Sequence, residues 1–246
     1  MMIHPEIQGA LAGERTRTFL AEAEAARRSR LLGRPVGRLV GRPLGRRPGR
    51  LPGRPLPRPS GGRPVRLRDG SAVLIRPVRP EDAGLLEDGF AGLSDRSRRM
   101  RFLGPKAGLS AAELRYLTDV DHRDHEALGA LDHARGGGVG IARYVRDRED
   151  PYAAEIAVTV IDGWQGRGLG TELLARLSER ACQEGIRRFT AAVATDNAPM
   201  TGLLRNLGAD VVGREFGTLE YEMALACAPV RRGRFRGNAP GRVELS

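Results

Sequence analysis

Three glycines mark a short segment whose chemistry would be the binding of an anion. Residues 165–170 read Gln-Gly-Arg-Gly-Leu-Gly, between an apolar strand pattern and an apolar helix pattern. The first turn of a helix has unpaired N–H groups at the positive end of the helix dipole, and glycine lets the backbone approach an anion closely. We therefore expect a pyrophosphate to bind here, with added contacts from Arg167 and Thr171. The alternative is a plain glycine-rich strand–helix connection.

Two familiar nucleotide-binding patterns fit this segment poorly. A P-loop ends in Gly-Lys-Ser/Thr, and the single lysine of the chain is Lys106. The dinucleotide pattern G-x-G-x-x-G, counted from Gly166, needs a glycine where Thr171 stands. A dinucleotide site also usually opens its domain, whereas this loop follows several expected elements.

The spacing of Gln165, Gly168 and Gly170 resembles the Q/R-x-x-G-x-G/A motif of the GNAT superfamily of N-acetyltransferases. The resemblance covers roughly residues 70–226. Segments 154–160, 195–200 and 207–209 are similar to the bacterial Pat-type protein lysine acetyltransferases. The resemblance implies a mixed α/β sheet with the GNAT acyl-CoA N-acyltransferase fold. It also implies acetyl-CoA as acyl donor, without a metal.

The resemblance further implies where the acyl donor would lie. Pantetheine would enter a V-shaped opening between strands 154–161 and 187–194 and pair with the backbone of the first strand. The implied cofactor-binding residues are Val158, Thr159, Val160, Gln165, Gly166, Arg167, Gly168, Leu169, Gly170, Thr171 and Asn197. For Asn197, an equal alternative is the N-cap of the following helix.

Glu155 is the candidate general base. Only a neutral amine attacks a thioester, and a nearby carboxylate can accept the proton that the amine releases. Glu155 matches the catalytic glutamate of the Pat-like proteins, and its apolar neighbours would raise its pKa. The alternative is a surface glutamate at the end of a strand.

The general acid of many GNAT enzymes is missing from this sequence. In the pattern N-x-x-A-x-x-x-Y-x-x-x-G-F, the tyrosine position is Leu204 and the phenylalanine position is Ala209. Tyr144 and Tyr221 are candidates by residue type alone, and we expect both to be packing residues.

Two further clusters contain chemically active side chains. Three histidines accompany Asp121 and Asp124, namely His122, His125 and His133. Their contiguous spacing before a strand makes side chains diverge, so we expect no metal site. A role at the mouth of the acceptor site is the alternative. The basic stretch 96–101 would form the acceptor wall of a GNAT fold and favour an acidic partner. A solvated helix face is the default alternative.

Alternation and periodicity predict the elements that must position these residues. We expect strands at 72–78, 125–132, 138–145, 154–161, 187–194, 210–215 and 218–226. We expect helices at 81–93, 95–102, after a capping box at Ser110–Glu113, from Leu169 to a stop at Gly185, and at 199–207.

Charge divides the chain into four predicted segments. Residues 27–68 hold 14 arginines and no acid, and Gly-Arg recurs every four residues from Gly33 to Arg54. We expect a short helical segment at 1–32, a disordered Arg/Gly/Pro-rich arm at 33–64, an acetyltransferase domain at 65–228 and a basic disordered tail at 229–246. The basic stretch 27–68 would bind nucleic acid or an anionic surface weakly through its charge, or serve as a linker without a partner.

Cys182 and Cys227 form no CxxC pair, and we expect buried free thiols. Without a run of about 18 apolar residues, no membrane span is predicted, and acidic residues near the N-terminus argue against a targeting peptide. These observations predict a cytoplasmic protein.

Taken together, the residues predict an N-acetyltransferase in which an amine attacks acetyl-CoA directly. The expected acceptor is a protein lysine, and a small-molecule amine is the alternative within the same class. A CoA-binding sensor or adaptor, attached to nucleic acid through its arginine-rich arm, is the alternative from another class.

Overall fold

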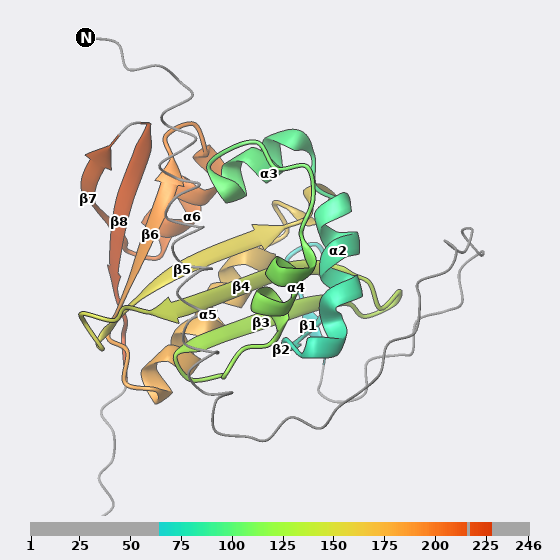
Figure 1. Cartoon of the computed structure of the whole chain (residues 1–246), viewed down its shortest axis with the longest axis horizontal. Coiled ribbons are helices and arrows are strands. Elements are labelled where there is room, and N and C mark those ends of the chain that lie inside the picture. Colours follow the sequence, from blue (N-terminus) through green and yellow to red (C-terminus); the bar gives the residue numbers. More distant parts are fainter. Residues whose placement is uncertain (1–63, 216, 228–246) are drawn as a thin grey trace, which may run out of the picture.

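The fold is a mixed β-sheet with helices on both faces, and the computed structural model describes residues 64–215 and 217–227 of it (Figure 1). The sheet has eight strands in the order β1-β2-β3-β4-β5-β6-β8-β7. Their bounds are Val65–Arg66, Ala72–Pro77, His125–Asp132, Gly138–Arg146, Ala153–Val160, Arg188–Ala194, Asp210–Glu215 and Thr218–Ala224, for β1 to β8. The predicted mixed α/β sheet is therefore confirmed. The predicted segment 1–32, the arm up to residue 63 and the tail 229–246 lie outside the described residues.

The helices divide between the two faces of the sheet (Figure 1). Helices α2 (Ala83–Ala91), α3 (Asp95–Phe102) and α4 (Ala111–Thr118) lie on one face, after the short 3-10 helix η1 (Pro80–Asp82). Helix α5 (Leu169–Gln183) crosses the other face beneath β3, β4 and β5. The 3-10 helix η2 (Asp162–Trp164) precedes α5, and α6 (Ala198–Asn206) follows β6.

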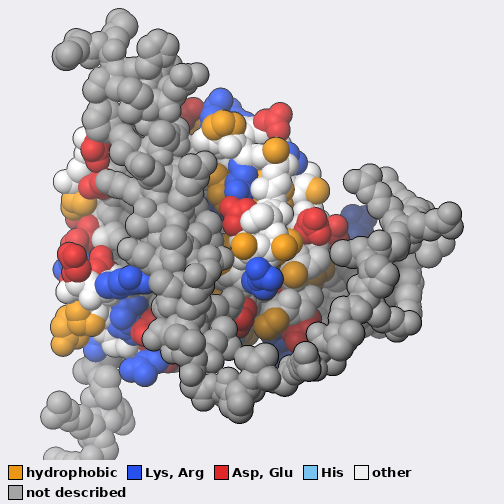
Figure 2. Space-filling view, in the orientation of Figure 1, with side chains coloured by type: hydrophobic (Ala, Val, Ile, Leu, Met, Phe, Trp, Pro, Cys, Tyr) orange, Lys and Arg blue, Asp and Glu red, His pale blue; other side chains and the backbone are white. Residues whose placement is uncertain are grey.

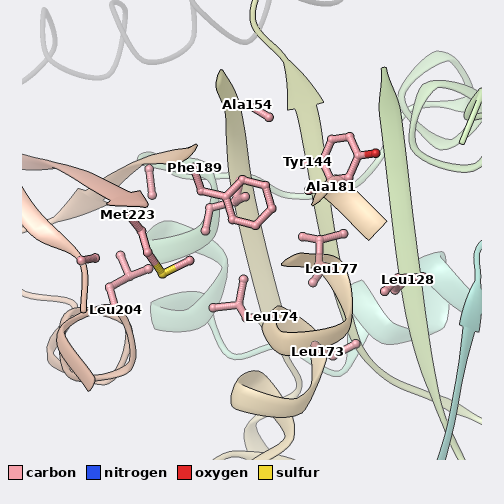
Figure 3. Packing of buried hydrophobic residues seen from close by; sticks show 14 of the residues in the cluster. Leu128, Tyr144, Ala154, Leu173, Leu174, Leu177, Ala181, Phe189, Leu204 and Met223 are labelled. Carbon is pink, nitrogen blue, oxygen red and sulfur yellow. The ribbon is translucent and has the colours of Figure 1, made fainter. Parts of the chain in front are cut away.

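Helix α5 holds the glycine loop against the sheet. Its apolar stripe is buried, as the sequence predicts, through Leu169, Leu173, Leu174, Leu177 and Ala181. Figure 3 shows Leu173, Leu174 and Leu177 in one cluster with Tyr144, Phe189 and Met223 of the sheet. Full burial of one leucine side chain contributes about 1.5–3 kcal/mol. This stripe therefore fixes the N-terminus of α5, and with it the loop, beneath the end of β5.

Strands β5 and β6 separate soon after they meet. They are the parallel pair of the sheet, and their pairing covers only residues 153–155 of β5 and 188–190 of β6. Beyond Glu155 the two strands diverge, while β5 stays in register with β4 as far as Val160. The sheet consequently has a V-shaped opening, as the family resemblance implied.

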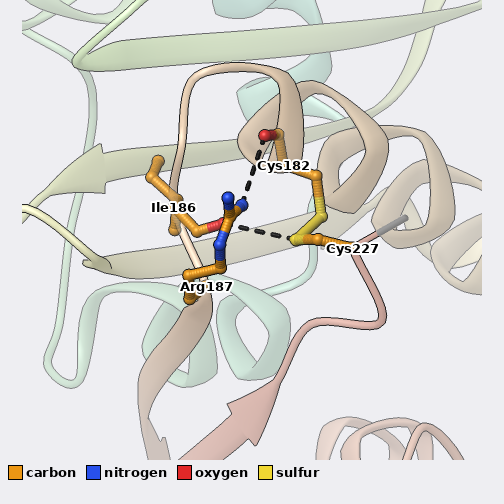
Figure 4. Close-up of a disulfide and its surroundings, with 4 residues drawn as sticks. All are labelled: Cys182, Ile186, Arg187 and Cys227. Atoms are coloured by element: carbon orange, nitrogen blue, oxygen red, sulfur yellow. Dashed lines mark hydrogen bonds between the residues drawn. A yellow bond between two sulfur atoms is a disulfide. The ribbon is translucent and has the colours of Figure 1, made fainter. Parts of the chain in front are cut away.

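A disulfide joins Cys182 at the end of α5 to Cys227 after β8, with a Cα–Cα distance of 5.4 Å (Figure 4). The prediction of free thiols is wrong, because β8 pairs with β6 and returns the chain to the end of α5. The carbonyl of Cys182 accepts a hydrogen bond from Nη1 of Arg187 at 3.5 Å. The cytoplasmic location stays a prediction and loses the support of free thiols.

The visible face of the described part carries both signs of charge. Figure 2 shows Lys and Arg side chains interspersed with Asp and Glu side chains on this face. Among the described residues, no helix is long and apolar enough to span a membrane.

Candidate active site

The loop before α5 has the backbone conformation that glycine favours. Gly166 and Gly168 have φ values of 75° and 89°, and Gly168 is the N-cap of α5. A Cβ at Gly170 would lie 3.1 Å from Cδ2 of Leu203 in α6. The chain therefore uses glycine here for left-handed backbone and close packing. The first-turn N–H groups of α5 line the cavity below and can receive a pyrophosphate.

Arg167 is turned away from this cavity. Its guanidinium pairs with Asp69 at 3.0 Å and stacks on Trp164 at 4.8 Å from the ring centroid. Its Nη2 also donates to the carbonyl of Gly163. These contacts fix the loop from behind, and Arg167 is the predicted loop residue that does not line the cavity.

Arg68 is the cation that lies at the loop, and sequence reasoning missed it. Its Cγ, Cδ and Nε all lie 3.3 Å from where a Cβ of Gly168 would be. Its backbone N–H donates to the carbonyl of Arg167 at 3.2 Å. Arg68 lines the cavity. No local motif marks it, because the turn after β1 meets the loop only through tertiary packing.

Gln165 holds the end of β5 beside the loop. Its Nε2 donates to the carbonyl of Val160 at 3.0 Å. Asp162 extends this link to α3, since it accepts from the N–H of Ser94 at 2.7 Å and from Oγ of Ser97 at 2.6 Å. The bond from Ser97 is the main cause that lowers the pKa of Asp162. Helix α3 is thereby fixed to the loop.

The β6-facing edge of β5 presents backbone groups to the opening. Successive residues of a strand direct their N–H and C=O alternately to the two neighbours. The N–H of Arg188 bonds to the carbonyl of Tyr152, so even-numbered residues of β5 face β6. Val158 and Val160 therefore offer backbone groups to the opening. Thr159 directs its backbone to β4, and its contribution to the cavity is its side chain.

Asn197 caps α6. Its Oδ1 accepts from the N–H of Met200 at 3.2 Å, which is the alternative that the sequence had left open. Asn197 also lines the cavity. The amide nitrogen of the same side chain can donate to a ligand, because a carboxamide carries separate donor and acceptor atoms.

One cavity of about 1200 Å³ joins all of these features. It extends from the loop along the opening between β5 and β6 to the face covered by α3 and α4. Loop N–H groups, a free strand edge and a nearby guanidinium suit a ligand with a pyrophosphate at one end and an amide-containing arm. The predicted residues that line it are Glu155, Val158, Thr159, Val160, Gln165, Gly166, Gly168, Leu169, Gly170, Thr171 and Asn197.

Glu155 stands where the two strands part. It is the last residue of β5 that pairs with β6, opposite Thr190, and it is exposed on the face of α3 and α4. Two of its electrostatic neighbours are Arg101 of α3 and Tyr116 of α4. A carboxylate at this position can accept a proton from a nucleophile that enters the cavity from that face.

Arg101, Tyr116 and Arg143 also line this end of the cavity, and His125 lies behind them, bonded to Arg143. Burial lowers the pKa of Arg101, and Glu155 and Tyr116 partly offset the effect. Burial, followed by Arg101, lowers the pKa of Arg143 to about 9. Burial raises the pKa of Tyr116 to about 12, and burial with Arg143 lowers the pKa of His125 to about 3. A guanidinium group stays charged in proteins, so both arginines are cations, and at neutral pH the Tyr116 and His125 rings are neutral.

The structure disperses the histidine cluster of the sequence. His122 bonds through Nδ1 to Glu126 at 2.8 Å, and His125 bonds through Nε2 to Arg143 at 3.1 Å. Asp121 accepts three backbone N–H groups, from Arg123, Asp124 and His125. Within residues 64–215 and 217–227, no group of three His, Cys, Asp or Glu side chains is placed to hold a metal.

A buried core leucine occupies the position at which many GNAT enzymes have a tyrosine. Leu204 is 1% exposed in α6 and belongs to the core. Tyr144 and Tyr221 are also buried core residues, as expected. The Tyr144 hydroxyl donates to the carbonyl of Arg123 at 3.0 Å, whereas the Tyr221 hydroxyl has no partner among the described residues.

Comparison with known proteins identifies the family. A model of the acetyltransferase (GNAT) family matches residues 100–209. The chain is 35% identical over 160 residues to acetyltransferase Pat of Mycolicibacterium smegmatis, covering 65% of this chain and 48% of that protein. It is 38% identical over 144 residues to acetyltransferase PA5475 of Pseudomonas aeruginosa, covering 58% of this chain and 77% of that protein.

Solved structures agree with the sequence comparison. The crystal structure of the GNAT domain of S. lividans PAT superimposes with a TM-score of 0.63 at 32% identity, over 66% of this chain and 96% of that one. The chain spans about half the length of the M. smegmatis relative. The match to most of PA5475, together with the fold, shows that this chain belongs to the GNAT family of acetyltransferases.

Proposed function

We propose that this protein transfers an acetyl group from acetyl-CoA to a primary amine, with Glu155 as the general base. The observation that carries the proposal is the position of Glu155 at the point where β5 and β6 part. The loop at 165–170 lies at the other end of the same cavity. A pyrophosphate at the loop and an arm along β5 would direct the thioester of acetyl-CoA toward Glu155.

The reaction needs one proton to move for each acetyl group transferred. The amine nitrogen forms a bond to the thioester carbonyl carbon, and the carbon–sulfur bond breaks with its electron pair on sulfur. Glu155 accepts the proton that the nitrogen releases. The thiolate of CoA is a good leaving group, so water can protonate it in place of the tyrosine that this chain lacks. Tyr221 and Tyr144 are not needed for this step.

The backbone and side-chain groups that line the cavity support the binding roles that the sequence predicted. Backbone N–H groups of residues 166–171 would hold the pyrophosphate, and Val158 and Val160 would pair with the pantetheine arm. The amide nitrogen of Asn197 would donate to the same arm. Arg68 would add the positive side chain that Arg167, paired with Asp69, does not supply.

A protein lysine is the acceptor favoured by the Pat resemblance, and a small-molecule amine is the alternative. The chain matches about half the length of the M. smegmatis protein, so the acceptor of this chain is determined by direct assay. The sensor or adaptor alternative depends on the arginine-rich stretch 27–68, most of which lies outside the described residues. Salt-dependent DNA binding that survives deletion of residues 27–68 would exclude an arm-based attachment.

Release of free thiol from acetyl-CoA in the presence of candidate amines tests the reaction. Glu155→Gln should lower kcat/KM at least roughly 100-fold, because general-base catalysis typically contributes about 10²–10⁴-fold. Glu87→Gln is the matched control, since Glu87 is exposed on α2 and outside the cavity. Equal rates for the Glu155→Gln variant and the unmodified protein would refute the role of Glu155. No thiol release above background with any amine would refute the enzyme proposal.

A further inference from the structure

Arg143 is a buried cation that contacts no carboxylate in the described part of the chain. It is 6% exposed. Its Nη1 lies 3.1 Å from Nε2 of His125, and its Nη2 donates to the carbonyl of Leu117 at 3.1 Å. Buried charges are normally paired, because an ion that leaves water without a counter-charge is strongly destabilised. Neither contact of Arg143 supplies a negative charge.

A second guanidinium lies close to the first. Arg101 and Arg143 line the same cavity, and the charge of Arg101 lowers the pKa of Arg143. Among residues 64–215 and 217–227, Glu155 is the carboxylate whose charge acts on Arg101. The rings of Tyr116 and His125 are neutral at pH 7, and the carboxylate of Glu113, which also lines the cavity, is paired with Lys106 at 2.6 Å. The remaining charges at this end are the guanidinium groups of Arg101 and Arg143 and the carboxylate of Glu155.

The charge balance distinguishes between classes of acceptor. An isolated ammonium group, such as a lysine side chain without acidic neighbours, would bring a third cation beside Glu155. An amine that also carries a carboxylate would bring a negative charge to the two guanidinium groups. A guanidinium presents parallel N–H donors that match the two oxygens of a carboxylate. The second class is therefore favoured by both charge and geometry.

The sheet register sets the distance that such a molecule must span. Arg143 of β4 lies opposite Ala157 of β5, and Glu155 lies opposite Val145. Arg143 and Glu155 therefore point to the same face as diagonal neighbours, which are about 7–8 Å apart in a sheet. An amine beside Glu155 and a carboxylate a few bonds away fit between these two side chains.

We propose that Arg101 and Arg143 form a carboxylate subsite, so that the preferred acceptor is an amine whose molecule also presents a carboxylate to these two guanidinium groups. This inference rests on the proposed acetyl transfer and narrows its acceptor. The carboxylate belongs either to a free α-amino acid or to an acidic residue beside a lysine in a peptide. Both sources place the same group on the same two guanidinium groups.

Paired acceptors in the thiol-release assay test the subsite and distinguish its sources. The free amino acid pair is L-phenylalanine and 2-phenylethylamine, which differ only by the carboxylate. The peptide pair is a blocked Asp-Lys dipeptide and its Asn-Lys counterpart. We expect one pair to show a preference for the carboxylate of roughly 30-fold or more in kcat/KM, as for a buried charge pair. The pair that shows it identifies the source.

Variants show whether the two arginines cause the preference. Arg101→Gln and Arg143→Lys should each reduce it at least roughly ten-fold. Arg115→Gln is the matched control, because Arg115 is exposed on α4 outside the cavity. If Arg143→Lys loses its cooperative thermal transition, the half-buried Arg101 decides the question. An undiminished preference in Arg101→Gln would overturn the inference.

Calorimetric titration of the CoA-saturated protein with the same four compounds separates this inference from the proposed reaction. Carboxylate-dependent binding without thiol release would refute the reaction and support the subsite. Thiol release with equal efficiency for both members of each pair would support the reaction and overturn the subsite. If no compound binds or reacts, both proposals fail.

Discussion

The two ends of the cavity are built in different ways. The donor end consists of residues 165–170, the edge of β5 and Arg68, and it offers mainly backbone N–H and C=O groups. The acceptor end consists of Arg101, Tyr116, Arg143 and Glu155, which are side chains from four different elements, and His125 supports it from behind through Arg143. Under the proposed function, the donor end would recognise a constant ligand through backbone geometry, whereas the acceptor end would set specificity through charge.

The disulfide supports the scaffold beneath both ends, and its loss should have the largest effect on stability. Cys227→Ser should lower the free energy of unfolding by about 2–4 kcal/mol, because the bridge closes a loop of 45 residues in the unfolded chain. Denaturant unfolding with and without reductant measures this difference. The KM values for acetyl-CoA and for the acceptor should not change. A raised KM for only one of them would show that the disulfide orders that end of the cavity.

Acid should destabilise the protein through the acceptor end. The pKa of His125 is lowered to about 3 in the folded state, so below pH 6.5 the unfolded chain binds a proton that the folded chain does not. Stability should therefore fall as the pH drops from 6.5, by up to about 1.4 kcal/mol per pH unit. Denaturant unfolding between pH 7 and 5 measures the slope. His125→Gln should flatten it, and an unchanged slope would assign the effect to another group.

A change of backbone at the donor end should weaken acetyl-CoA alone. Gly168→Val places a branched side chain at φ 89° and 3.3 Å from Arg68, and left-handed strain costs about 1–3 kcal/mol. We expect acetyl-CoA binding to weaken at least roughly ten-fold. Quenching of Trp164, the single tryptophan of the chain, measures this binding.

Gly163→Ala is the control in the same region. Gly163 is not in the left-handed φ region, and no atom lies within 4 Å of where its Cβ would be. If both variants bind acetyl-CoA equally well, the glycine loop is not the pyrophosphate site.

The smallest effect is expected from Arg68. Since this guanidinium is exposed, Arg68→Ala should raise the KM for acetyl-CoA only about five-fold, as for a partly screened charge contact. Added salt should reduce the difference. Arg66→Ala, on the exposed end of β1, is the control. A change in acceptor KM, with none for acetyl-CoA, would remove Arg68 from the donor end.

The donor end could be predicted closely because its signals are local. Glycines at fixed offsets, an apolar strand and a helix with a 3.6-residue stripe all lie within one stretch, and the structure has each of them. The capping box at Ser110 and Glu113 was likewise readable and is present. Asn197 shows the limit of such signals, because the same residue type serves a cap and a ligand equally well.

The acceptor end could not be predicted to the same depth. Glu155 was found through family resemblance, and the acceptor wall was expected from the basic stretch 96–101. Arg143 gave no signal, since one arginine in an alternating strand normally faces solvent. Its burial depends on α3 and α4 covering that face of the sheet.

The sequence by itself determined the order of elements, the glycine loop before α5, the family and the excess of charge in the terminal segments. Each of these follows from neighbouring residues or from a motif of fixed spacing. Only the tertiary structure decided the disulfide, the position of Arg68 beside Gly168, and the placement of Arg101 and Arg143 in the same cavity as Glu155. These contacts join residues far apart in the chain, and strand register and helix packing bring them together.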